Sequence, residues 1–204
     1  MVNELDSKRA STASPSDSPV DGTRVDASPI YGPVKSWRFG RSLGIDLILE
    51  SSICTFDCTY CQLGRIRERT MQRRTWVPTR RVMLELERRG FDDIDVVTFS
   101  GNGEPTLALN LGECLKAVRG LTQVPVHVLT NATLLRDPAV RAELDEADRV
   151  YLKLDAATDA TLARMNHPHE GLKLADIVEG MCLFRRQRKG HLAVQTMITK
   201  ANIA

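Results

Sequence analysis

Five short apolar runs, separated by longer stretches with helical periodicity, constrain the fold of this chain more than any other feature. The runs read GIDLIL, DVVTFS, VHVLTN, VYLKLD and LAVQTMI, and they cover residues 44–49, 95–100, 126–131, 150–155 and 192–198. Runs that are almost continuously apolar and rich in β-branched residues are typical of parallel strands buried on both faces. Their alternation with helical stretches predicts βα units joined by right-handed crossovers.

The stretches between the runs carry helix signals. Apolar residues recur at helical spacing over residues 79–89 and from residue 174 to Gly190, a residue type that commonly ends helices. Asn110 precedes Glu113 by three residues, which predicts a capping box. Asp137 followed by Pro138 predicts an N-cap with proline at the first helical position.

The length of the chain limits how far a barrel of such units can close. A complete eight-fold (βα) barrel typically takes about 250 residues, and residues 29–204 are too few for one. The fold class we expect is therefore α/β, a partial (βα) barrel of parallel strands that stops after the fifth strand. Residues 1–28 are rich in Ser, Asp, Pro and Ala and lack apolar periodicity, so we expect a disordered tail before a core domain over 29–204.

The charge balance and the cysteines limit which binding surfaces and which cellular location the chain can have. Lys and Arg total 28 against 26 Asp and Glu, a net charge of +2, so any basic binding surface has to be local. The chain begins without a signal-peptide stretch and has no run long enough to cross a bilayer, which predicts a cytoplasmic protein that does not use a membrane. Three of the five cysteines fall within eight residues, and in a reducing compartment this favours metal ligation over disulfides.

The three clustered cysteines are Cys54, Cys58 and Cys61, in a C-x3-C-x2-C pattern directly after the first predicted strand. That position is a loop at the carboxyl end of the sheet, where α/β proteins bind ligands. Three thiolates suit a 4Fe–4S cluster in which one iron has no protein ligand. A structural zinc site or a ferredoxin would use four ligands, so these alternatives fit the pattern less well.

Several motifs resemble the radical SAM superfamily, in particular its relatives of wyosine-type tRNA-modification enzymes. Besides the cysteines, the resemblance rests on four segments that follow or include the predicted strands, namely Gly40–Ile48, Ser100–Leu107, Thr130–Leu135 and Leu152–Ala156. It covers nearly everything from Tyr31 onward. The sequence departs from the superfamily in having Gly-Asn-Gly-Glu where Gly-Gly-Glu is usual, and five visible strands where six are usual. No cysteine precedes Cys54, so the second cluster of the wyosine-forming enzymes is not supported.

The resemblance implies two cofactors, a 4Fe–4S cluster and S-adenosylmethionine (SAM), and a role for each matching position. Tyr60 would pack near the adenine, Gly101, Gly103 and Glu104 would border the methionine moiety, and Asn131, Lys153 and Asp155 would line the cavity. The implied reaction is reductive cleavage of SAM to a 5′-deoxyadenosyl radical that abstracts hydrogen from an unidentified substrate, with RNA among the candidates. It requires a one-electron donor such as flavodoxin or ferredoxin. The alternatives are a glycyl-radical-enzyme activase and a non-catalytic iron–sulfur fragment.

Other residues have a structural interpretation beside the functional one. Lys153 and Asp155 share a strand face and would be costly to bury unless paired with each other or used in the site. Cys114 and Cys182 lie in apolar helical stripes, which predicts buried, unreactive thiols. His127 lies between apolar strand residues, which predicts an interior histidine with satisfied hydrogen bonds rather than a catalytic base.

Two sets of polar residues each have two interpretations that the sequence does not decide between. His167 and His169 fall between helical segments, either in an exposed loop or at the cavity mouth. A run of arginines follows the cysteines and would form either a solvated face or a site for the phosphates of an anionic substrate such as RNA. It consists of Arg65, Arg67, Arg69, Arg73, Arg74, Arg80 and Arg81.

Overall fold

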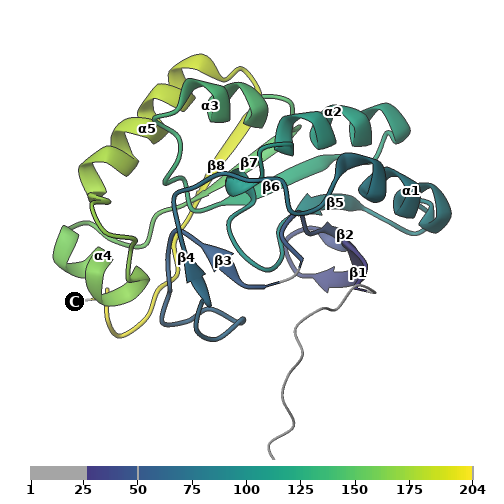
Figure 1. The fold of residues 1–204 in the computed structure, drawn as a ribbon. Coiled ribbons are helices and arrows are strands. Elements are labelled where there is room, and N and C mark those ends of the chain that lie inside the picture. Colours follow the sequence, from purple (N-terminus) through teal and green to yellow (C-terminus); the bar gives the residue numbers. More distant parts are fainter. Residues whose placement is uncertain (1–26, 50, 204) are drawn as a thin grey trace, which may run out of the picture.

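The computed structural model describes residues 27–49 and 51–203, so the expected disordered tail over 1–28 lies almost wholly outside the described residues. Six strands form one sheet in the order β1-β2-β5-β6-β7-β8 (Figure 1). They are β1 (Ile30–Ser36), β2 (Gly40–Ile45), β5 (Val96–Phe99), β6 (Val126–Thr130), β7 (Arg149–Lys153) and β8 (His191–Gln195). A second, two-stranded sheet pairs β3 (Ile53–Cys54) with β4 (Glu68–Arg69).

The five strands from β2 to β8 are all parallel, as the sequence predicts. Helices connect them, and α1, α2, α3 and α5 lie along one side of the sheet while α4 lies near the small sheet (Figure 1). The helices are α1 (Thr79–Arg89), α2 (Leu111–Leu121), α3 (Pro138–Leu144), α4 (Asp159–Asn166) and α5 (Leu174–Gln187), with a 3-10 turn η1 (Pro105–Leu107) before α2. The α/β fold class and the parallel βα units are therefore confirmed.

The antiparallel edge strand β1 was missed by the sequence analysis. It pairs with β2 through the hairpin turn that ends at Gly40, whose φ of 75° suits glycine. Most of β1 is exposed, so its sequence shows no apolar alternation to detect. Tyr31 is the cross-strand partner of Gly44, its ring fills the space beside that glycine, and its hydroxyl is 2.7 Å from the Ser100 hydroxyl.

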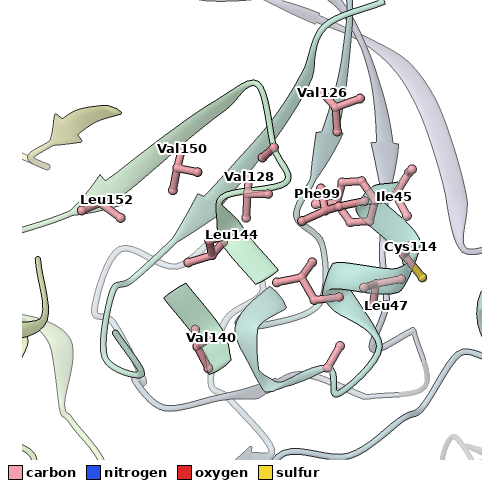
Figure 2. Packing of buried hydrophobic residues seen from close by; sticks show 14 of the residues in the cluster. Ile45, Leu47, Phe99, Cys114, Val126, Val128, Val140, Leu144, Val150 and Leu152 are labelled. Carbon is pink, nitrogen blue, oxygen red and sulfur yellow. The ribbon is translucent and has the colours of Figure 1, made fainter. Parts of the chain in front are cut away.

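The core lies between the sheet and its covering helices (Figure 2). Alternate strand residues point into it, as the period of two requires. Val126 and Val128 of β6 and Val150 and Leu152 of β7 are essentially unexposed there. They pack with apolar side chains of the helices, among them Leu115, Val140, Leu144 and Phe184.

The first and last parallel strands begin and end earlier than predicted. The first covers 40–45 instead of 44–49, because the Asp46 carboxylate accepts hydrogen bonds from the amides of Ile48 and Leu49 and turns the chain away from the sheet. The last covers 191–195 instead of 192–198. It is the edge of the sheet and is not buried on both faces, since Val194 is 58% exposed.

Two predictions about the helices are wrong and two are confirmed. Asn110 makes no capping bond to α2, because its amide donates instead to the Val77 carbonyl, 2.9 Å away. Cys182 is exposed on α5, whereas Cys114 is buried as expected. Asp137 caps α3 by accepting from the Ala139 amide at 2.8 Å. No helix within the described residues is long and apolar enough to cross a membrane.

His127 is interior, as predicted, but its hydrogen bonds are not satisfied. It lies on β6 between the rings of Phe39 and Tyr151, at centroid distances of 5.2 and 5.4 Å. Neither ring nitrogen has a hydrogen-bond partner among the described residues. Burial lowers the pKa of His127 from 6.5 to about 4. Folding therefore favours the neutral imidazole.

This histidine makes the fold sensitive to acid. Because its folded pKa is depressed, the stability it contributes is fully present above pH 6.5 and is lost as the pH falls towards 4. We expect unfolding to cost about 2 kcal/mol less at pH 5 than at pH 7 through His127 alone. Urea titrations of the His127→Leu variant should show a pH dependence smaller by that amount. Replacement of the exposed His191 by leucine is the control, and equal pH dependence in both variants would contradict this assignment.

Candidate functional site

The three predicted cluster cysteines lie on one loop that begins at the end of β3. Cys54 closes β3, while Cys58 and Cys61 follow in a tight turn in which the Cys61 amide donates to the Cys58 carbonyl at 3.0 Å. All three side chains are partly buried. The Ile53 backbone also bridges to Gly103, so the start of this loop, which we call the cluster loop (residues 54–61), lies beside the Gly-Asn-Gly-Glu segment that follows β5.

Backbone hydrogen bonds hold the cluster loop against the end of α4. The Asp57 amide donates to the Asn166 carbonyl and the Thr59 amide to the Met165 carbonyl, both at 2.9 Å. In the opposite direction, the His169 amide donates to the Thr55 carbonyl at 2.8 Å. The conformation of the cluster loop therefore depends on a segment more than one hundred residues away in sequence.

Two of the three sulfurs accept a hydrogen bond from a side-chain amide. Asn131 Nδ2 is 3.5 Å from Cys54 Sγ, and Asn166 Nδ2 is 3.2 Å from Cys58 Sγ. Burial raises the pKa of the Cys54 thiol to about 12, and the nearby Glu104 carboxylate adds to the effect. Burial also raises the pKa of Cys58. Metal ions replace the protons of such thiols on binding.

This donor set fits an iron–sulfur cluster better than a single metal ion. Among the residues of 27–49 and 51–203, no three His, Cys, Asp or Glu side chains converge so as to hold one ion. A 4Fe–4S cluster is larger and takes its thiolates from separate corners. Amide donors aimed at sulfur are the contacts that a thiolate ligand uses. Cys54, Cys58 and Cys61 would hold the cluster and leave one iron without a protein ligand.

Asp46 organises the Gly-Asn-Gly-Glu segment. Its carboxylate accepts from the amides of Ile48 at 2.9 Å and Asn102 at 3.0 Å, which ties the chain after β2 to the chain after β5. Gly101 has a φ of 145°, and a Cβ atom there would lie 2.4 Å from Asp46 Cγ. Only glycine allows the chain to approach this carboxylate so closely.

Gly103 is under a tighter constraint, and its replacement should disturb the segment. A Cβ atom at Gly103 would lie 1.6 Å from the Ile53 carbonyl oxygen, and a backbone atom cannot rotate away. We expect Gly103→Ala to lower the free energy of unfolding by about 1 to 3 kcal/mol, as overpacking does. In Gly120→Ala, a helix position with open space around it, alanine should instead stabilise by about 0.5 to 1 kcal/mol. Urea titration of both variants measures this, and equal effects would contradict the close approach.

Glu104 is 2% exposed and joins the ends of two parallel strands. Its carboxylate accepts hydrogen bonds from the Thr130 hydroxyl at 2.5 Å and from the backbone amide of Asn131 at 2.7 Å. It also accepts from the hydroxyl and the backbone amide of Thr106, at 2.7 and 3.1 Å. Burial raises its pKa even though these donors oppose the shift. Since three of the four bonds end on Oε1, the spare acceptor capacity of this carboxylate lies at Oε2.

Tyr60, Lys153 and Asp155 meet in one network. The Tyr60 hydroxyl donates to Asp155, and the Lys153 ammonium lies 3.4 Å from Asp155 and 4.9 Å from the centre of the Tyr60 ring. The mutual pairing of Lys153 and Asp155 that the sequence left open is therefore present. Asp155 also accepts from Asn166 Nδ2 at 2.9 Å and from the Met197 amide at 2.7 Å. Buried Asp155 thus connects the cluster loop with the ends of α4, β7 and β8.

Comparison with known proteins identifies the family. The sequence matches the radical SAM superfamily over residues 50–189. The chain belongs to the radical SAM superfamily. Over 169 residues it is 48% identical to a UPF0026 protein of Synechocystis. The matched segment covers 83% of this chain and 64% of that protein. The chain therefore spans less than two thirds of this relative's length.

Solved structures of the radical SAM superfamily share the fold. The structure of TYW1 with a lysine–pyruvate adduct bound has a TM-score of 0.55 and 18% identity, over 79% of this chain and 57% of that one. Streptococcus suis SuiB bound to S-adenosylmethionine has a TM-score of 0.55 and 19% identity, over 79% of this chain and 34% of that one. The radical SAM family uses a 4Fe–4S cluster and SAM as its cofactors.

Two residues of the candidate site were missed by the sequence analysis. Asn166 contacts Cys58, Tyr60 and Asp155, yet in the sequence it is only the last residue of a short amphipathic helix. Asp46 lay within a run predicted as strand. Both act through contacts between distant segments, and spacing along the chain carries no signal for them.

The arginine run is not one uniform surface. Arg73 is largely buried and donates to the carbonyls of Thr106 and Ala108 at 2.8 and 2.9 Å, so it supports the 3-10 turn. Arg69 donates to the His167 carbonyl at 3.2 Å, beside the cluster loop. Arg74 and Arg81 pair with glutamates, and Arg65 Nε lies 3.6 Å from Asp57 Oδ2. Arg65, Arg67 and Arg80 are exposed.

The backbone of His167 and His169, which the sequence places either in an exposed loop or at the cavity mouth, lies beside the cluster loop. The His169 amide bonds to the cluster loop, and its side chain is partly buried. His167 adopts a left-handed conformation with a φ of 41°, and its side chain is exposed. The segment is thus close to the cluster loop, and contact of these side chains with a substrate stays a prediction.

Proposed function

We propose that this chain is a radical SAM enzyme that reductively cleaves SAM and uses the resulting radical to abstract hydrogen from a substrate. The observation that carries the proposal is the loop of three cysteines with amide donors directed at two of its sulfurs. It lies at the carboxyl ends of the parallel strands, where α/β proteins bind ligands. Held by Cys54, Cys58 and Cys61, the reduced cluster would supply the one electron that cleaves SAM to methionine and a 5′-deoxyadenosyl radical.

The residues around the loop would bind and orient SAM. We assign the methionine moiety to the segment of Gly101, Gly103 and Glu104, which the two glycines allow to pack closely against Asp46 and Ile53. Tyr60 would pack against the adenine, with its ring held in place by Asp155 and Lys153. Asn131 would act from the Cys54 side of the site.

Spectroscopy tests SAM binding separately from turnover. The chain is reconstituted anaerobically with iron and sulfide, reduced, and examined by electron paramagnetic resonance before and after SAM is added. If the amine and carboxylate of SAM bind the open iron, the spectrum of the reduced cluster changes. Adenosine, which lacks both groups, is the control. A spectrum unchanged at saturating SAM would refute this mode of binding.

RNA is the substrate class that a specific observation favours. Arg65, Arg67 and Arg80 are exposed, and Arg65 and Arg67 lie just after the cluster loop, where cations can hold phosphates. If Arg65 and Arg67 both contact RNA, the double variant Arg65→Gln/Arg67→Gln should bind unmodified tRNA more weakly. The slope of log affinity against log salt concentration should become shallower by about two. Arg185→Gln with Arg186→Gln, two exposed positions on α5, is the charge-matched control. Equal losses in both pairs would argue against a specific RNA site.

Other parts of the proposal concern partners and setting. The reaction needs an external one-electron donor such as flavodoxin or ferredoxin, and a reducing cytoplasm would keep the thiols available. An activase would instead bind a large glycyl-radical partner protein.

A further inference from the structure

Asn166 reaches three functional groups at once. Its Nδ2 lies 3.2 Å from Cys58 Sγ, 3.1 Å from the Tyr60 hydroxyl and 2.9 Å from Asp155 Oδ2. It is 1% exposed, so water does not compete for these bonds. We propose that Asn166 is a positioning residue that donates a hydrogen bond to the Cys58 thiolate and thereby sets the reduction potential of the cluster.

The orientation of the amide follows from its neighbours. An ionised carboxylate only accepts hydrogen bonds, so the NH2 end and not the oxygen of Asn166 has to face Asp155. The same NH2 group then faces Cys58. Asn166 Oδ1 is buried and has no partner within the described part of the chain. An unsatisfied buried acceptor is costly, so the orientation is imposed by the three groups around Nδ2.

The backbone fixes Asn166 as firmly as its side chain does. Its carbonyl accepts from the Asp57 amide, and the carbonyl of the preceding Met165 accepts from the Thr59 amide, so the residues on either side of Cys58 are both bonded to this segment. Met165 is fully buried. The N–H group aimed at Cys58 is consequently held at a defined distance from the sulfur.

A donor directed at a ligand sulfur affects the two redox states unequally. One-electron reduction adds negative charge to the cluster and its thiolates, and a hydrogen bond to sulfur stabilises the more negative state. Removing the donor should therefore shift the midpoint potential to lower values. This inference rests on the proposed function, because it presumes that Cys58 is a cluster ligand.

The test is a redox titration of the reconstituted 204-residue chain with dithionite, which supplies the electron. Asn166→Leu removes the donor at similar volume, and Asn166→Ala removes it with less steric demand. Leu162→Met, at a buried position of α4, is the control for disturbance of this helix. We expect both Asn166 variants to retain the cluster and to show a lower midpoint potential, while Leu162→Met titrates like the wild type.

Each outcome has a distinct meaning. Unchanged potentials in Asn166 variants with full iron content would overturn the inference and leave the proposed function intact. A wild type that binds no cluster would overturn both. If neither variant folds, pulsed electron paramagnetic resonance of wild type labelled with 15N-asparagine decides. Two distinct nitrogen couplings, from Asn131 and Asn166, would support the inference, and fewer than two would overturn it.

Discussion

Replacing Cys58 with alanine is expected to abolish the iron–sulfur cluster. Only three thiolates are available in the cluster loop, so the loss of one leaves two of the four irons without a protein ligand. The amide of Asn166 would then face a methyl group instead of a sulfur. After anaerobic reconstitution, iron and sulfide content should fall to the level of the blank, together with the visible absorbance of the cluster.

Cys182→Ala provides the matched control for this loss. Cys182 is exposed on α5, away from the cluster loop, so its variant should bind as much iron as the wild type. A Cys58→Ala protein that still binds four irons would show that Cys58 is not a ligand. Equal losses in both variants would point to general damage by cysteine replacement.

Replacing Glu104 with leucine is expected to destabilise the fold by about 3 kcal/mol or more, because each buried donor left without an acceptor costs about 1 to 3 kcal/mol. The carboxylate accepts four hydrogen bonds from Thr106, Thr130 and Asn131, and leucine would leave all of these donors without their acceptor. Urea unfolding of the cluster-free protein measures the change without interference from cofactor binding.

Glu113→Leu separates this network from the general effect of losing a glutamate. Glu113 is exposed on α2, and such surface substitutions usually change stability by less than about 0.5 kcal/mol. A Glu104→Leu protein as stable as Glu113→Leu would contradict the role of Glu104 in joining the ends of β5 and β6.

The fold was predictable where local pattern and tertiary burial agree. The parallel strands at residues 96–99 and 126–130 are almost wholly buried, and the strand at 149–153 is buried at Val150 and Leu152, so their apolar runs indicate them directly. Strand β1 was missed because it is mostly exposed and gains its place by pairing with β2. The end of β2 was misplaced because the Asp46 side chain competes for the backbone amides that follow it.

In the candidate site, too, the residues that belong to local motifs were predictable and those that depend on tertiary contacts were not. The cysteines and the Gly-Asn-Gly-Glu segment are local motifs, and the structure brings them together through the bridge between Ile53 and Gly103. Asn166 makes its contacts with Cys58 and Asp155 only after α4 has packed against the cluster loop. No pattern within its own helix indicates that contact.

The central claim is that this chain uses its three cysteines to cleave SAM, and the most direct measurement is the amount of 5′-deoxyadenosine formed. Wild type and the Cys61→Ala variant are reconstituted anaerobically, reduced, and incubated with SAM. We expect wild type to form 5′-deoxyadenosine and methionine, while Cys61→Ala forms none above the blank. Wild type that carries a full cluster and forms no 5′-deoxyadenosine would contradict SAM cleavage by this chain and favour a non-catalytic iron–sulfur protein.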